Sequence, residues 1–154
     1  MGCVIEFYDP GQETGWAGGI DGELLGCALI RVYRDRPLAL APRLPGGKAW
    51  IELPEYRRAN NKVDPNDLIS LGVKVGRIKE QCLGWGYEVY EVHPSTWKGG
   101  IPKEIHHKRI LGLLRSSEMR AVHHGLQNVP ESFQHNVLDA VGGFLWAARK
   151  EGLR

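Results

Sequence analysis

The sequence predicts an α/β protein with a mixed five-stranded sheet flanked by helices. Two observations support this fold class. Short apolar runs separated by tight-turn signals fill the first third of the chain, and segments with the spacing of amphipathic helices alternate with strands after it. Hairpins followed by a strand–helix–strand unit give antiparallel and parallel pairs in one sheet. For a chain of 154 residues we expect a single domain, residues 1–154, with one core.

The first half of the chain supplies four of the predicted strands. An apolar run ends at Asp9-Pro10-Gly11, a turn signal, and Asp21-Gly22 is typical of a type I′ hairpin turn. The segment 34–47 contains three prolines and two glycines, and we expect it to be a loop. The four strands are expected at residues 3–8, 15–20, 24–33 and 48–53.

Helices dominate the predicted second half. Asp64-Pro65 is a typical helix start, with an N-capping carboxylate followed by proline at the first helical position. The helix that follows has an apolar stripe. Gly72 and Gly76 lie on a second face of this helix and indicate a close neighbour, either the sheet or a helix of a partner subunit. A fifth strand is expected at residues 86–93, and further helices at 103–115, 116–127 and 132–150.

The composition excludes several classes of protein. Hydrophobic residues make up 42% of the chain and charged residues 25%, which is typical of a folded protein and not of a disordered one. No apolar run reaches the length of about 18 residues that a membrane helix needs. Glu6 and Asp9 interrupt the start of the chain, so we expect no secretory leader. Cys3, Cys27 and Cys82 are few and far apart, which favours free thiols in the cytoplasm of a bacterial cell or a phage-infected host.

The distribution of charge says more than its sum. The net charge of +2 does not by itself indicate a nucleic-acid partner. Basic residues nevertheless gather in the stretches 31–62 and 98–120, while several carboxylates lie inside apolar segments. Basic groups can meet phosphates, and inward-facing acids can hold a metal ion. The pattern is typical of a metal-dependent nuclease.

Three carboxylates stand where a strand or a helix prefers apolar residues. Asp9 ends the first strand, Glu52 ends the fourth, and Asp139 lies inside the last helix, on a face shared with His135 and Asn136. Taken singly, each acid has an ordinary explanation as a turn former or a solvated side chain. Together they form the oxygen-rich set that Mg²⁺ prefers, and paired ions about 4 Å apart can cleave a phosphodiester. The joint pattern therefore favours a metal site.

Five segments resemble the RuvC resolvases, a family of the RNase H-like class. One of them, Asn60-Asn61 and the helix from Pro65 with Leu71-Gly72, resembles the helix that forms the family's dimer interface. The segment from Asp9-Pro10-Gly11 to Thr14-Gly15 resembles the family's opening motif, and residues 50–54 (WIELP) resemble the strand with its catalytic Glu. Residues 93–99 (HPSTWKG) resemble the exit of the next strand and its basic loop, and residues 135–140 (HNVLDA) resemble the final catalytic motif. The resemblance covers nearly the whole chain in order.

This resemblance implies an RNase H-like fold and a homodimer that resolves Holliday junctions in DNA recombination and repair. The cut would be symmetric and would depend on two ions of Mg²⁺ or Mn²⁺, with Asp9, Glu52 and Asp139 as ligands. The family's fourth ligand, an Asp or a His, falls at Asn136 here, so we favour His135, one residue earlier. The residues that the resemblance implies for DNA binding are Tyr56, which would stack on a base, and Arg57, Arg58, Lys98, Lys103, Lys108 and Arg109.

Two departures from the family leave alternatives open. The loop 34–47 replaces a helix of the family, and the stretch 116–133 is longer than its counterpart. These differences suggest a divergent branch, for example in a bacteriophage, with a broader range of substrates. The alternatives are a flap or fork nuclease on the same fold and a non-catalytic junction-binding module. An actin-like phosphotransferase is disfavoured because it needs two such domains, and His106-His107 is disfavoured as a zinc site because neighbours on a helix face different ways.

Overall fold

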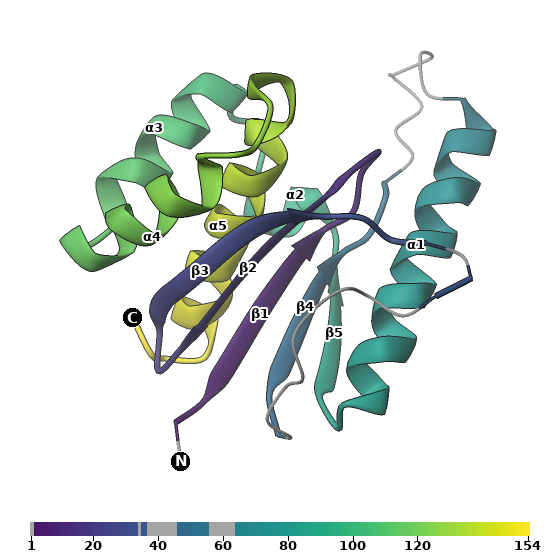
Figure 1. Ribbon diagram of the computed structural model, residues 1–154, viewed down its shortest axis with the longest axis horizontal. Coiled ribbons are helices and arrows are strands. Elements are labelled where there is room, and N and C mark those ends of the chain that lie inside the picture. Colours follow the sequence, from purple (N-terminus) through teal and green to yellow (C-terminus); the bar gives the residue numbers. More distant parts are fainter. Residues whose placement is uncertain (1, 34, 37–45, 56–63) are drawn as a thin grey trace.

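The centre of the computed structural model is one five-stranded sheet with the strand order β3-β2-β1-β4-β5 (Figure 1). The structure describes residues 2–33, 35–36, 46–55 and 64–154. β1 pairs antiparallel with β2 and β2 with β3, whereas β4 runs parallel to β1 and β5 parallel to β4. The predicted mixed sheet is therefore confirmed. Its strands are β1 (Val4–Asp9), β2 (Thr14–Ile20), β3 (Glu23–Ile30), β4 (Lys48–Glu52) and β5 (Glu88–Val92).

The hairpin between β2 and β3 turns as the sequence predicts. Asp21 and Gly22 both have positive φ angles, 51° and 79°, as a type I′ turn requires. β3 ends at Ile30 and not at Tyr33, because Ile30 pairs with Thr14, the first residue of β2. Among the described residues, no strand lies beside the backbone beyond Ile30 to continue the ladder. Most of the predicted loop 34–47 lies outside the described residues.

Five helices in the described part of the chain accompany the sheet. The Asp64 side chain accepts a hydrogen bond from the Asn66 backbone N–H, 2.8 Å away, and so caps the first helix as predicted. A one-turn helix after β5 was not predicted, because its Pro94 also reads as the end of a strand. None of the helices in the described ranges is long and apolar enough to span a membrane. The helices are α1 (Pro65–Gly84), α2 (Pro94–Trp97), α3 (Lys103–Leu113), α4 (Ser116–Leu126) and α5 (Glu131–Lys150).

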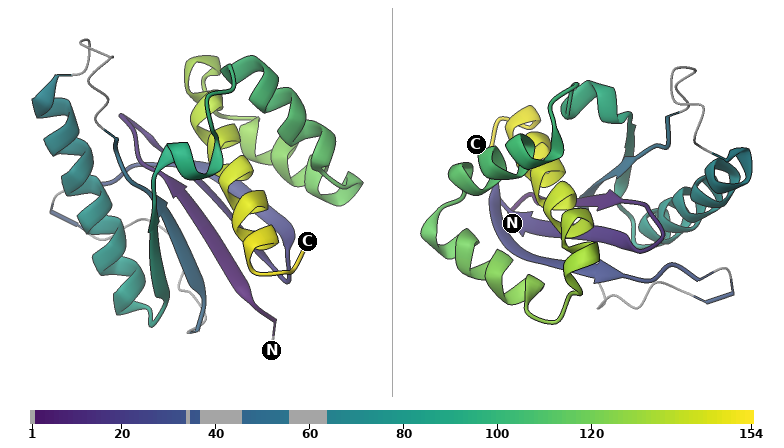
Figure 2. Two further views of the ribbon diagram at one scale, coloured as in Figure 1. Left: turned by 180° about the vertical axis from the view of Figure 1, so that it is seen from behind. Right: turned by 90° about the horizontal axis from the view of Figure 1, so that it is seen from above.

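The helices cover the sheet from both sides. α5 crosses one face together with α3 and α4, and α1 lies along the other (Figure 2). Successive side chains of a strand point to opposite faces. In β1, Phe7 accordingly packs into the core beneath α5, while Tyr8 packs against Cys82 of α1. The core therefore has two layers, and β1 contributes to both.

Two glycines let α5 lie directly on the sheet. A Cβ at Gly143 would stand 2.3 Å from the ring of Phe7, and one at Gly15 would stand 2.0 Å from the carbonyl oxygen of Asn136. Glycine at these two positions therefore allows α5 to lie close to β1 and β2. In α1 the expected neighbour of Gly72 and Gly76 is not the sheet, because a Cβ at either position would meet open space among the described residues.

Candidate active site

Asp9 and Glu52 end two neighbouring parallel strands. β1 and β4 run side by side with Tyr8 paired to Ile51, so the next residue of each strand stands at the same edge of the sheet. These next residues are Asp9 and Glu52, the last residues of β1 and β4. The parallel pairing alone therefore brings two carboxylates together, although they are 43 positions apart in the sequence.

Strand alternation aims both carboxylates at α5. Asp9 shares the face of Phe7, two residues earlier, and Glu52 shares the face of Trp50. Both of these apolar side chains belong to the core beneath α5, which carries Asp139. The three acids are 8%, 9% and 3% exposed, respectively. They form a cluster, here called the carboxylate cluster, defined by Asp9, Glu52 and Asp139.

Electrostatics in the carboxylate cluster oppose the full ionisation of Asp9. Burial is the main cause that raises its pKa well above the ordinary value, and the Glu52 and Asp139 carboxylates add to it against the opposing charge of Lys98. Burial acts to lower the pKa of Lys98 itself, but the three carboxylates outweigh that effect and raise it. One ammonium group therefore faces three acids, and the cluster favours additional positive charge.

Trp97 and Lys98, at the end of α2, contact the cluster from the side. The indole Nε1–H of Trp97 donates to Glu52 Oε2 over 2.8 Å. Lys98 Nζ lies 3.2 Å from Glu52 Oε2 and 3.4 Å from Asp139 Oδ2. The sequence predicts Lys98 as a DNA-binding residue, and the structure finds its ammonium among the acids. The role of Trp97 was missed, because α2 itself was not predicted.

The histidine that contacts Asp139 comes from α3. His107 Nε2 lies 3.0 Å from Asp139 Oδ1. His135 lies one turn before Asp139 on α5, where burial and the charge of Lys103 lower its pKa while Asp139 acts in the opposite direction. The Asn136 amide donates to the backbone carbonyl of Glu13, 3.3 Å away. His135 remains the predicted fourth ligand, and His107, which the sequence analysis considers only as part of a disfavoured zinc site, is a second candidate.

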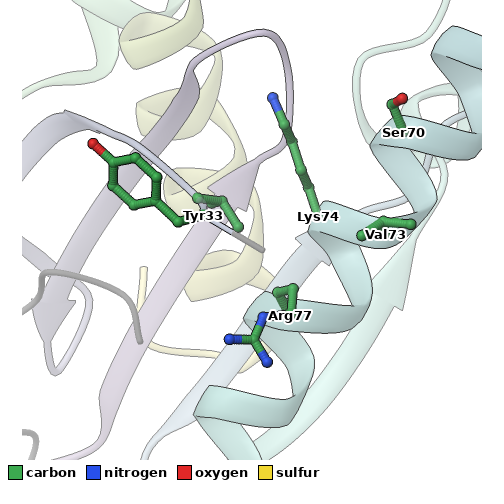
Figure 3. Close-up of a pocket in the computed structure, with 6 residues that line it drawn as sticks. Tyr33, Ser70, Val73, Lys74 and Arg77 are labelled. Carbon is green, nitrogen blue, oxygen red and sulfur yellow. The ribbon is translucent and has the colours of Figure 1, made fainter. Parts of the chain in front are cut away.

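The turn after Asp9 is held from both faces of the sheet. Lys74 of α1 donates to the carbonyl oxygens of Gly11 and Gln12, at 2.5 and 2.8 Å, and Figure 3 shows its side chain reaching from the helix toward that turn. Asn136 of α5 holds the same turn at Glu13. These contacts fix the backbone that follows the first carboxylate, and they link α1 and α5 to the site.

The donor set of the carboxylate cluster suits a hard divalent cation. Mg²⁺ and Mn²⁺ take carboxylate oxygens as ligands, and three are gathered here. Within the described ranges, no three such groups already stand at the spacing of a finished metal site. The ammonium of Lys98 lies against two of the acids and supplies positive charge at this point.

The other predicted DNA-binding residues divide into two groups. Tyr56, Arg57 and Arg58 lie outside the described residues. The second group is exposed on one helix, α3, which packs beside α5 and also carries His107. This group consists of Lys103, Lys108 and Arg109.

Comparison with known proteins gives a match in structure. No protein-family model matches the chain, and comparison with curated protein sequences gives no match. A structure of RuvC from Thermus thermophilus aligns with a TM-score of 0.56 at 15% identity, over 97% of this chain and 96% of that one. The chain has a RuvC-like fold. A second structure, T. thermophilus RuvC in complex with Holliday junction substrate, aligns at a TM-score of 0.51 and 13% identity over the same shares. In this RuvC-like fold the carboxylate cluster lies where β1, β4 and α5 meet.

Proposed function

We propose that the protein is a metal-dependent endonuclease that cuts branched DNA, with the four-way junction as its main substrate. The observation that carries the proposal is the convergence of Asp9, Glu52 and Asp139, all nearly buried, at one edge of the sheet. Burying three acids together is unfavourable unless positive charge joins them. A divalent cation would supply this positive charge, and it could at the same time bind a phosphate of the DNA.

Asp9, Glu52 and Asp139 would hold Mg²⁺ or Mn²⁺, with an imidazole as a further ligand. When bound, such ions polarise a phosphodiester and make water a stronger nucleophile at neutral pH. Asp9 interacts electrostatically with both of the other acids, because the Glu52 and Asp139 carboxylates each raise its pKa. It is therefore the carboxylate best suited to be shared between two ions.

Neighbouring side chains would keep the ligands in place. Trp97 holds one oxygen of Glu52 through its indole N–H, and Lys98 contacts both Glu52 and Asp139. His107 orients Asp139 through the 3.0 Å contact, and its ring can take up or give a proton at Nε2. These residues reduce the motion of the acids and exclude water from one side of the cluster.

The active form would be a homodimer that joins through α1. Ile69 and Val73 of this helix are 66% and 41% exposed, and Gly72 and Gly76 beside them leave room for a close neighbour. Exposed apolar side chains next to glycines are typical of a helix–helix interface. A two-fold dimer has two identical carboxylate clusters, which would account for paired cuts on a four-way junction.

The basic residues of α3 would bind the DNA backbone. Lys103, Lys108 and Arg109 are exposed on this helix, whose His107 contacts Asp139. Lysine and arginine bind phosphates through charge, largely without regard to base sequence. The RuvC structure that contains a Holliday junction substrate supports the choice of a junction over linear duplex as the substrate.

The test is a cleavage assay on a panel of labelled substrates: four-way junction, flap, fork, duplex and RNA–DNA hybrid, each in Mg²⁺, Mn²⁺ and EDTA. Asp9→Asn removes one charge of the cluster, and Asp67→Asn, at an exposed position on α1, is the matched control. We expect paired symmetric nicks on the junction from wild type and Asp67→Asn, and none from Asp9→Asn or in EDTA.

The other outcomes each have a definite meaning. Faster cutting of flaps or forks would make the protein a broader branched-DNA nuclease. Tight junction binding without cutting in any metal would leave a non-catalytic binding module. Cutting by Asp9→Asn at the wild-type rate would move the chemistry away from the carboxylate cluster.

A further inference from the structure

A recess beside the carboxylate cluster is not used by the proposed cleavage chemistry. It has a volume of about 230 Å³ and lies between α3, α5 and the end of α2. Lys98 lines the recess and also contacts the cluster, at Glu52 and Asp139. A group in the recess would thus stand next to the phosphate to be cut. The lining residues that matter here are Trp97, His106, Arg109, Gly142, Trp146 and Arg149.

The walls of the recess are aromatic and rigid. The ring of Trp97 packs against that of His106, with 5.4 Å between centroids. Trp146 stands edge-on against Trp50 at 5.2 Å, and Trp50 in turn stacks on Tyr90. Such packing fixes the rings as flat surfaces before any ligand arrives. Flat, fixed aromatic surfaces favour a flat aromatic ligand.

The charges around the recess are all of one sign. Lys98, Arg109 and Arg149 line it, and within the described part of the chain none of its lining residues is acidic. Arg109 and Arg149 are exposed, so their guanidinium groups stand at the rim and can meet an anion in solvent. Aromatic walls with a cationic rim match a nucleotide, whose base is flat and whose phosphates are anionic.

One polar atom inside the recess lacks a partner. His106 Nε2 is buried and makes no hydrogen bond with any described residue. It lies beside Gly142, where a Cβ would stand 3.2 Å from it and 2.5 Å from Ile110 Cδ1, so only glycine lets α3 and α5 approach this closely at the wall of the recess. A buried nitrogen without a partner is unfavourable, and the polar edge of a base would satisfy it.

From these observations we propose that the recess is a subsite for one unpaired nucleobase of the branched DNA, stacked on Trp146 and hydrogen-bonded to His106, with its flanking phosphates on Arg109 and Arg149. The inference rests on the proposed function for the nature of the DNA. A paired base is held in the duplex stack, whereas a base at a branch point can turn outward at low cost. The subsite would therefore favour branched over linear DNA.

The test measures binding in EDTA, so it does not depend on cleavage. One four-way junction carries 2-aminopurine beside the crossover, and a matched junction carries abasic nucleotides at the same positions. We expect wild type to change the fluorescence of 2-aminopurine and to bind the abasic junction roughly tenfold more weakly than the intact one. In Trp146→Leu and His106→Phe the difference in affinity between the intact and the abasic junction should shrink. The melting temperature of each variant checks that it is folded.

Arg149→Ala tests the rim without touching the core, because Arg149 is exposed. It should weaken binding of the intact junction more than Arg120→Ala does, which removes the same charge from an exposed position on α4. Equal binding of intact and abasic junctions by wild type would overturn the subsite, even if the protein cuts junctions well. Equal effects of Arg149→Ala and Arg120→Ala would also count against it. A protein that shows the base dependence but never cuts would keep the subsite and refute the nuclease.

Discussion

At the scale of single residues, Asp9 links the stability of the protein to its function. Its pKa is raised by burial and by the other two acids, so the folded protein holds this proton to a higher pH than the unfolded chain does. Stability from this group is therefore present below the ordinary aspartate pKa. It is lost as the pH rises from that value through the raised one. If the carboxylate cluster binds a cation as proposed, the bound cation would offset this loss of stability.

Asp9→Asn should accordingly stabilise the protein at neutral pH in EDTA. The neutral amide keeps the shape of the side chain and removes the repulsion, and each kcal/mol gained corresponds to about 2–4 °C in a chain of this length. Thermal melting in EDTA and in millimolar Mn²⁺ measures the effect. The cation should narrow or reverse the difference in melting temperature between Asp9→Asn and wild type. A destabilised Asp9→Asn in EDTA would mean that the carboxylates do not repel one another as inferred.

The two histidines near Asp139 make a second prediction at this scale. His107 contacts Asp139 directly at 3.0 Å, whereas His135 interacts with it through charge. Single-turnover cleavage of a junction should fall about a hundredfold or more in His107→Ala, as for loss of a proton-transfer group. The fall in His135→Ala should be smaller. The opposite order would support His135, the residue that the sequence predicts, as the fourth active-site group.

At the scale of elements, the site depends on how closely α5 approaches the sheet. Gly143→Ala would drive a Cβ to 2.3 Å from the ring of Phe7. Overpacking of this kind costs about 1–3 kcal/mol, and it would also shift Asp139, one turn earlier. Denaturant unfolding should show the loss, with reduced cleavage beside it.

Gly112→Ala on α3 is the control for this prediction. A Cβ there meets open space among the described residues, and alanine favours a helix over glycine by up to about 1 kcal/mol. This variant should be neutral or slightly more stable than wild type. If both variants behaved alike, the close packing of α5 on β1 would not be what holds the site together.

The elements also show how far the sequence could lead. Alternation and turn signals predicted all five strands, and the carboxylates at the ends of β1 and β4 were found because acids at strand ends stand out. The contact between His107 and Asp139 could not be predicted, because it depends on how α3 and α5 pack, with Gly142 between them. Lys98 was assigned to DNA from its place in a basic stretch, and only tertiary structure put it beside Glu52.

At the scale of the whole molecule, the exposed apolar face of α1 predicts a dimer. Val73 is 41% exposed and lies between Gly72 and Gly76 on that face. Val73→Asp places a charge at the centre of the proposed interface and should shift sedimentation from dimer to monomer. Met119→Asp is the control, since Met119 is 40% exposed on α4. A wild type that sediments as a monomer at all concentrations would refute the dimer through α1.

The dimer is also expected to couple the two cuts. Lys74 on α1 holds the turn that follows Asp9, so a partner helix packed on α1 lies one contact away from the site. A monomeric Val73→Asp should therefore nick a junction in one strand and rarely produce the paired cuts of wild type. This separates loss of the dimer from loss of the carboxylate cluster, which would abolish both nicks.

The most direct test of the central claim is the rate of strand cleavage on a four-way junction as a function of Mg²⁺, for wild type, Glu52→Gln and Glu91→Gln. Glu52 belongs to the carboxylate cluster, whereas Glu91 is exposed on β5 and is the matched control. We predict that cleavage by wild type and Glu91→Gln rises with Mg²⁺, and that Glu52→Gln is slower by about a hundredfold or more. Cleavage by Glu52→Gln at the wild-type rate, or cleavage that persists in EDTA, would contradict the account.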